Sequence, residues 1–203
     1  MSKRYARVAV LVSGGGTNLQ AIIDAEASGL ITSGKVVCVI SSNPDAYALE
    51  RAKRAKIKTY VAPRAKLSQR EFEEIIISVL EKEKIDLIVL AGFMSILSAD
   101  FTKRYERRII NVHPSLIPSF CGEGFYGLRV HEAALAKGVK VTGATVHFVN
   151  EIPDGGEIIM QKAVSVREGD TPSTLQKRVM RQAEWKILPA AVEKISKEIT
   201  GRV

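Results

Sequence analysis

Asn111 and His113 stand two residues apart in the segment NVHPSLIP, directly after the apolar residues Ile109 and Ile110. Alternate residues of a β-strand point to the same face, roughly 6–7 Å apart, so one strand end would present an amide and an imidazole together. An amide can donate a hydrogen bond to an oxyanion, and an imidazole can transfer a proton. A hydrogen-bonded structural pair at a strand end accounts equally well for this spacing.

The segment SGGGTNLQ, residues 13–20, joins an apolar run to a stretch with helical spacing. Its three glycines let a ligand approach the backbone closely, and a helix N-terminus offers free N–H groups. The dinucleotide pattern G-x-G-x-x-G fails because Leu19 stands at its third glycine, and no Gly-Lys-Ser/Thr follows for a triphosphate. The segment therefore predicts a site for a single phosphate group, with an ordinary tight turn as the alternative.

The other candidate residues have weaker patterns. His147 lies in the apolar run TVHFV and is typical of a structural histidine, while His131, among charged residues, is predicted at the surface. Asp154 in IPDGG is, on spacing, a turn signal. Cys121 could form a Cys/His nucleophile with His113, but no orienting carboxylate or amide is evident, so we interpret it as a small buried thiol. The three histidines lack metal-ligand spacing, which predicts no metal site.

Composition sets the broad class. The chain has 203 residues, 46% hydrophobic and 26% charged, which indicates a globular protein with a sizeable core. Its two cysteines do not make a disulfide framework, so we expect a reducing, cytoplasmic location. The net charge of +8 fits either a solvated basic face or anionic small substrates, because no basic run is interleaved with aromatic residues as nucleic-acid binding would favour. The apolar runs are too short for a membrane helix or a signal peptide.

The elements that must position these residues alternate along the first half. Ser68 and Glu71 match a capping box at the start of one helix. The βαβα rhythm predicts a three-layer α/β fold with a mostly parallel central sheet and a Rossmann-like N-terminal half. Strands are expected at 7–13, 35–42, 58–63, 86–93 and 108–113, and helices at 18–29, 46–56, 68–84 and 98–106.

The second half has a different order of elements. Thr171 and Pro172 mark the start of a helix that continues to the end of the chain, and Pro189 is expected to kink or break it. No repeat or linker divides the chain, so one domain is expected. A glycine-rich loop at 122–127 precedes a helix at 129–138, and strands at 141–149 and 157–166 flank a loop at 150–156.

Five segments together resemble one family. They are RVAVLVSGGGTNLQAII, LAGFMSIL, NVHPSLIPSF, GATVHFV and DGGEIIMQ, and they resemble the phosphoribosylglycinamide formyltransferases in order and spacing over about residues 7–190. The resemblance implies a formyltransferase fold and transfer of the formyl group of 10-formyltetrahydrofolate to the amine of 5-phosphoribosylglycinamide in de novo purine biosynthesis. The amine would attack directly, through a tetrahedral intermediate, without a metal or a covalent enzyme intermediate.

The resemblance also implies an organisation of the chain and of its partners. Residues 1–203 would form a single formyltransferase domain, with a phosphate-binding half at 1–108 and a catalytic and folate-binding half at 109–203. Its partners would be two small-molecule substrates, with no nucleic acid and no membrane. The protein would be a monomer or a homodimer.

Roles for individual residues follow from the resemblance. Asn111 would hydrogen-bond the oxyanion, His113 would act as general acid, and the charge of Asp154 would raise the pKa of His113. Glu184 would bond the ribonucleotide. The ribonucleotide side comprises Gly16, Thr17 and Asn18 at the phosphate, with Arg181, Gln182, Ala183 and Glu184; the folate side comprises Arg70, Met94, Ser95, Ile96, Leu97, Asn111, Asn150, Glu151, Ile152, Pro153 and Asp154.

The chain departs from the family pattern at two places. Ser95 stands where some members carry arginine, and the loop FCGEGFYG is longer than in other members, which usually have proline in place of Cys121. The rival interpretations are a methionyl-tRNA formyltransferase, which normally has an added C-terminal domain, and a folate-hydrolysing relative, which normally has an added N-terminal one. A non-catalytic nucleotide-binding module is the alternative from another class, and it leaves Asn111, His113 and Asp154 unexplained.

Overall fold

Seven strands form one mixed sheet in the computed structural model, which describes residues 5–201. Across the sheet the order is β3-β2-β1-β4-β5-β6-β7. The first five strands run parallel to their neighbours, whereas β5, β6 and β7 pair antiparallel, so the expected mostly parallel sheet is confirmed. The strands are β1 (Ala6–Val12), β2 (Gly34–Ser41), β3 (Lys58–Val61), β4 (Leu87–Leu90), β5 (Ile109–His113), β6 (Val141–Phe148) and β7 (Ile158–Ser165).

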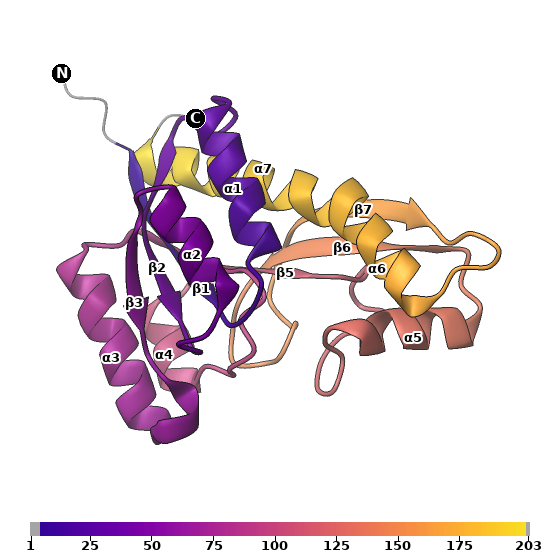
Figure 1. The fold of residues 1–203 in the computed structure, drawn as a ribbon, viewed down its shortest axis with the longest axis horizontal. Coiled ribbons are helices and arrows are strands. Elements are labelled where there is room, and N and C mark those ends of the chain that lie inside the picture. Colours follow the sequence, from indigo (N-terminus) through magenta and orange to yellow (C-terminus); the bar gives the residue numbers. More distant parts are fainter. Residues whose placement is uncertain (1–4, 202–203) are drawn as a thin grey trace.

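Helices cover both faces of the sheet and make the three layers expected (Figure 1). One face packs against α1 (Thr17–Ala27), α2 (Tyr47–Arg54), α6 (Pro172–Val179) and α7 (Trp185–Thr200). The opposite face packs against α3 (Gln69–Lys82) and α4 (Ala99–Arg104), while α5 (Leu128–Lys137) contacts α6. Short helical turns at Arg64–Lys66 and Met180–Glu184 complete the chain.

The apolar run of β1 explains why the sheet is central. Successive strand residues point to opposite faces, so Val8 and Val10 enter the core under α1 and α7, and Ala9 and Leu11 enter the core under α3. All four side chains are fully buried. A strand with no polar alternation is what a sheet covered on both faces requires.

Two helices, α3 and α6, begin at the capping residues that the sequence predicts. The Ser68 hydroxyl accepts from the Glu71 amide at 3.3 Å, and the Glu71 carboxylate accepts from the Ser68 amide at 2.9 Å, which completes the capping box of α3. Thr171 caps α6 in the same way, with Pro172 at its first position. Each cap satisfies amides that the first turn leaves unpaired.

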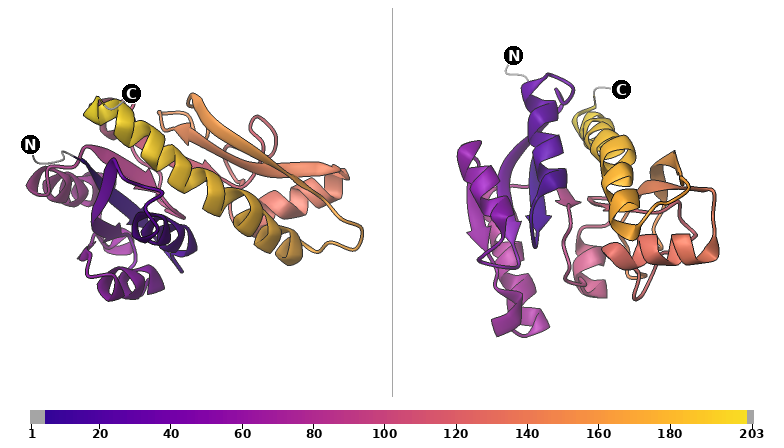
Figure 2. Two further views of the ribbon diagram at one scale, coloured as in Figure 1. Left: turned by 90° about the horizontal axis from the view of Figure 1, so that it is seen from above. Right: turned by 45° about the vertical axis from the view of Figure 1, so that its right-hand side comes forward.

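The helix does not break at Pro189, because Pro189 lies inside the continuous helix α7, so this part of the prediction is wrong. A π-helical turn at Met180–Glu184 precedes α7. The helix therefore runs obliquely over both halves of the sheet (Figure 2) and contacts β1 and β2 as well as β6 and β7. No helix within residues 5–201, α7 included, has the length and apolar character needed to cross a membrane.

The surface position expected for His131 is also wrong. His131 is 0% exposed, since it shares the buried face of α5 with Val130 and Ala134. Neither ring nitrogen has a hydrogen-bond partner within residues 5–201. Burial, with a smaller repulsion from His113, lowers the pKa of His131 to about 4.

This burial predicts a pH dependence of stability. As the pH falls, the unfolded chain protonates His131 near its ordinary pKa of 6.5, whereas the folded chain does so only near 4. The unfolded state thus binds more protons between these values, and the free energy of unfolding should fall through this window by up to roughly 3 kcal/mol. Urea denaturation at a series of pH values measures it. His131→Leu should flatten the decline, and equal declines in both proteins would contradict the assignment.

Candidate active site

The antiparallel pairing of β5 with β6 builds the centre of the site. It sets Asn111 opposite His147 and His113 opposite Thr145. The Asn111 Nδ2 atom lies 3.3 Å from His147 Nε2. The sheet itself therefore brings a second imidazole to the predicted Asn111–His113 pair.

Asp154 reaches this centre from the loop between β6 and β7. Its φ of 55° is left-handed, a conformation in which aspartate is tolerated better than most residues. A Cβ at Gly156 would come within 1.8 Å of the Phe148 carbonyl oxygen, so the loop closes tightly on the end of β6. Asp154 Oδ2 then lies 3.3 Å from His113 Nδ1, and Oδ1 lies 3.4 Å from His147 Nε2. The structure thus brings together all three predicted catalytic residues.

The loop that follows β5 contributes two backbone groups to this centre. The Gly122 amide donates to Asp154 Oδ2 at 2.9 Å. The Phe120 carbonyl, at a residue with φ 51°, lies 2.8 Å from His113 Nε2. A carbonyl can only accept, so Nε2 carries the hydrogen. Nδ1 is therefore the nitrogen of His113 that is left to exchange a proton.

His147 is a site residue that the sequence interpretation missed. It is buried, as expected of a structural histidine, and its Nδ1 donates to the Phe148 carbonyl at 2.7 Å. Its Nε2 can then accept from Asn111 Nδ2, which fixes the amide orientation. Only the pairing of β5 with β6 would have predicted this contact, and a single sequence does not reveal which strands pair.

Burial is the largest single influence on the pKa values of His113 and Asp154. It lowers the pKa of His113 below the ordinary 6.5, although the Asp154 charge and the Phe120 carbonyl oppose it in part. The charge of Asp154 therefore raises the pKa of His113, as expected, but burial lowers it by more. Burial alone would raise the pKa of Asp154, but the Gly122 amide that donates to it and the nearby His147 and His113 rings hold it below 3.8. At neutral pH, Asp154 is an anion and His113 is mainly neutral.

A cleft of about 140 Å³ opens beside Asn111, His147 and Asp154. Its rim is apolar, since Ile96 and Ile152 are 72% and 59% exposed, and Met94 is exposed nearby. Arg70 lies outside the cleft, exposed and paired with Glu74. The predicted folate residues that line it are Ser95, Ile96, Leu97, Asn111, Asn150, Glu151, Ile152, Pro153 and Asp154.

The glycine loop and the π-helical turn meet at a buried polar pair. Asn18 Nδ2 donates to Glu184 Oε2 at 2.8 Å, across 166 residues of sequence. Asn18 Oδ1 is buried and has no partner within the described residues, so an acceptor is left for a ligand. Burial raises the pKa of Glu184 to about 7 despite the bond from Asn18. Arg181 and Gln182 are exposed, whereas Ala183 is buried in the core and has only backbone atoms to offer.

A larger groove, of about 750 Å³, lies between α1 and α7 and is lined by Thr17, Ala21, Trp185 and Pro189 among others. It contains none of the catalytic cluster, so we place the active site at the smaller cleft, where the titratable groups converge. Within residues 5–201, no three His, Cys, Asp or Glu side chains gather as metal ligands would.

Comparison with known proteins gives consistent matches. A family model described as Formyl transferase matches residues 6–192. The trifunctional purine biosynthetic protein adenosine-3 of Homo sapiens is 47% identical over 96% of this chain, which spans 19% of that protein. The phosphoribosylglycinamide formyltransferase of Haemophilus influenzae is 43% identical over 92% of this chain and 85% of its own length. Glycinamide ribonucleotide transformylase 1 from Symbiobacterium toebii has a similar structure, with a TM-score of 0.88 and 42% identity over 96% of this chain and 89% of that one.

Cys121 is half-buried rather than fully buried, and its Sγ lies 3.3 Å from the Pro118 carbonyl. Burial, and then the charge of Asp154, raises the pKa of the thiol above 9.0. Cys121 is thus disfavoured as a thiolate nucleophile at neutral pH.

Alkylation of the folded protein tests this. Iodoacetamide should label Cys121 slowly at pH 7.5, with a rate that climbs beyond pH 9, because the thiolate is the reacting form. Asp154→Asn should speed labelling by removing the nearby charge. In Cys121→Ser the remaining Cys38, fully buried, should stay unlabelled. Rapid labelling of Cys121 at pH 7.5 would contradict the raised pKa.

Proposed function

The chain belongs to the formyl transferase family, and we propose that it transfers the formyl group of 10-formyltetrahydrofolate to the amine of 5-phosphoribosylglycinamide. The observation that carries the proposal is the cluster of Asn111, His113 and Asp154, in which His113 is buried and the other two line an apolar-rimmed cleft. The relatives named above supply the reaction class, and the cluster supplies groups suited to it. The step belongs to purine biosynthesis, as the names of the trifunctional relatives say of those proteins.

Asn111 serves the oxygen of the formyl group. As the amine attacks the formyl carbon, that oxygen gains negative charge, and an amide hydrogen directed at it lowers the barrier. Asn111 Nδ2 lies 3.3 Å from His147 Nε2, which accepts from it, and 3.5 Å from Asp154 Oδ1. The longer contact, to Asp154, is the one that the amide exchanges for the oxyanion. His147 is in this way a positioning residue for Asn111.

His113 transfers a proton from the attacking amine to the leaving group through its Nδ1 atom. Because Nε2 is held on the Phe120 carbonyl, the neutral ring presents the Nδ1 lone pair and can take a proton from the attacking amine. The imidazolium so formed lies 3.3 Å from the Asp154 carboxylate, which stabilises it. His113 then acts as general acid and returns the proton to the leaving folate nitrogen as the carbon–nitrogen bond breaks.

The two substrates bind in two different regions of the site. The ribonucleotide phosphate lies on the backbone of Gly16, Thr17 and Asn18, and the Asn18–Glu184 pair offers acceptors to the ribose. The folate supplies an activated formyl group, and the apolar rim at Ile96 and Ile152 suits its flat ring system. The chain is divided here into a phosphate-binding half at 1–108 and a catalytic and folate-binding half at 109–203, but the division is not strict, because Ile96 of the first half lies on the folate side and Glu184 of the second lies on the ribonucleotide side. No metal takes part in this scheme, and we expect the protein in the cytoplasm.

The catalytic assignment predicts the behaviour of single variants. The purified protein should formylate 5-phosphoribosylglycinamide and not charged initiator tRNA. His113→Ala and Asp154→Asn should each lower kcat by roughly 10²–10⁴-fold, because a general acid–base group or its charged partner is lost. Asp24→Asn, a change at an exposed residue of α1, is the matched control. Near wild-type turnover in either site variant would refute the mechanism.

The pH profile adds a second test of the same assignment. Asp154 raises the pKa of His113, so its loss should move the acid limb of kcat/KM to lower pH. An unmoved acid limb in a folded Asp154→Asn variant would mean that His113 is not the titrating base.

The phosphate assignment predicts the effect of a charge in the glycine loop. Gly16 is unsuitable, since a Cβ there would lie 2.6 Å from the Ala48 side chain, but a Cβ at Gly15 meets nothing within 4 Å. Gly15→Asp should raise KM for the ribonucleotide by more than about tenfold, because its carboxylate repels the phosphate. Gly15→Asn is the neutral control of equal size. Calorimetry with a folate analogue should show little change, and equal loss of both ligands would refute the division of the site.

A further inference from the structure

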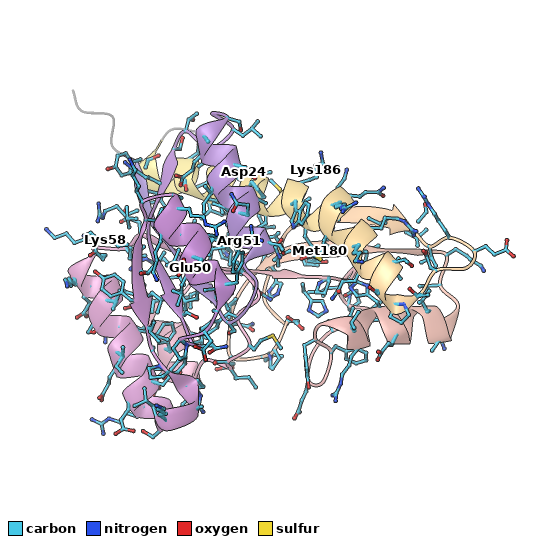
Figure 3. All side chains as sticks on the ribbon, in the orientation of Figure 1. Asp24, Glu50, Arg51, Lys58, Met180 and Lys186 are labelled. Carbon is cyan, nitrogen blue, oxygen red and sulfur yellow. The ribbon has the colours of Figure 1, made fainter. Side chains whose placement is uncertain are left out.

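Arg51 lies on α2 behind the glycine loop, where α2 faces α1 (Figure 3). Its Nε donates to the Gly15 carbonyl at 2.8 Å, and its Nη1 donates to the Gln20 side chain at 3.1 Å. One guanidinium thus joins the loop to the first turn of α1. No motif in the sequence marks this residue.

The charge of Arg51 is not neutralised by a neighbour. Within residues 5–201, no carboxylate lies at ion-pair distance from it. The adjacent Glu50 pairs with Lys53, and the Arg51 guanidinium stacks 5.1 Å above the Tyr47 ring centroid. A half-buried cation beside a loop of free amides raises the affinity of that loop for an anion.

We propose that Arg51 is a positioning residue for the substrate phosphate. By holding the Gly15 carbonyl on the α2 side, it leaves the amides that follow turned toward the phosphate, and it adds an unpaired positive charge behind them. The inference rests on the proposed function, in which those amides bind the ribonucleotide phosphate.

The loop has a second attachment to α2 that does not involve Arg51. The Ala48 amide donates to the Gly14 carbonyl at 3.0 Å, and Gly16 packs against Ala48 so closely that only glycine fits. Substitution of Arg51 should therefore leave the loop in place and alter its affinity for the phosphate, rather than unfold α2.

Steady-state kinetics of Arg51→Gln test the proposal. KM for the ribonucleotide should rise about tenfold, because the glycine loop loses both the positive charge behind it and the contact that orients its amides. The kcat and the KM for the folate should stay within about twofold. Arg51→Lys keeps the charge but loses the two-pronged contact, so it should recover part of the affinity.

Arg54→Gln is the matched control. Arg54 lies one turn along α2 and also stacks on Tyr47, at 5.7 Å, but it makes no hydrogen bond to the glycine loop. The two variants therefore share the loss of one charge and of one cation–π contact. Only Arg51→Gln should raise the KM, and an equal rise in Arg54→Gln would overturn the proposal.

Glycinamide riboside, the substrate without its phosphate, distinguishes a failure of this proposal from a failure of the proposed function. Arg51→Gln should lower kcat/KM about tenfold for the ribonucleotide and leave it unchanged for glycinamide riboside. Equal loss for both substrates, or no loss for either, would overturn the role of Arg51. If the wild-type protein used the riboside as well as the ribonucleotide, the phosphate assignment itself would fall. Should Arg51→Gln fail to fold, Arg51→Lys decides the question with the same two substrates.

Discussion

The carboxylate of Asp154 joins segments that are distant in the sequence. It lies between two imidazoles, His113 on β5 and His147 on β6, and it accepts from the Gly122 amide. A buried charge is costly unless partners surround it, and no single one of these neighbours would suffice. The strand pair, the loop after β5 and the loop after β6 must therefore all be in place before the carboxylate is accommodated. The proposed reaction centre is the point where these requirements meet.

The position of the Asp154 cluster follows from the change of strand direction in the sheet. Among the parallel strands, the glycine loop after β1 and the end of β5 lie at the same, carboxyl-terminal edge, where α/β folds bind ligands. The antiparallel strand β6 then returns past β5 and places His147, one residue before its own C-terminal end, opposite Asn111. The glycine loop thus follows a parallel strand, whereas His113 and His147 lie on the antiparallel pair.

Local signals in the sequence predicted most of the elements, because caps, apolar runs and helical spacing act over a few residues. The capping box at Ser68 and the shared face of Asn111 and His113 are of this kind. The misses depend on contacts between distant segments. The contact of His147 depends on the strand register, the burial of His131 depends on the packing of α5, and the continuous course of α7 past Pro189 is set by its packing on β1, β2, β6 and β7.

The net direction of the pKa shift at His113 could not be predicted from the sequence for a related reason, although the upward contribution of Asp154 was predicted. A neighbouring carboxylate can be inferred from a family resemblance, but the degree of burial that outweighs it depends on every segment around the ring. The contact between His113 and Asp154 was likewise expected only through resemblance, since no local pattern relates positions so far apart.

The course of α7 has a consequence for the order in which the molecule can form. This helix packs on β1 and β2, at the beginning of the chain, and on β6 and β7, near its other end. During synthesis, α1 and α2 cover only part of one apolar face of the first strands, and the rest of that face stays exposed until residues near 190 have been made. Contacts of such long sequence separation slow folding and prolong the exposure of apolar surface. A nascent chain of this design has reason to engage a chaperone before its last helix appears.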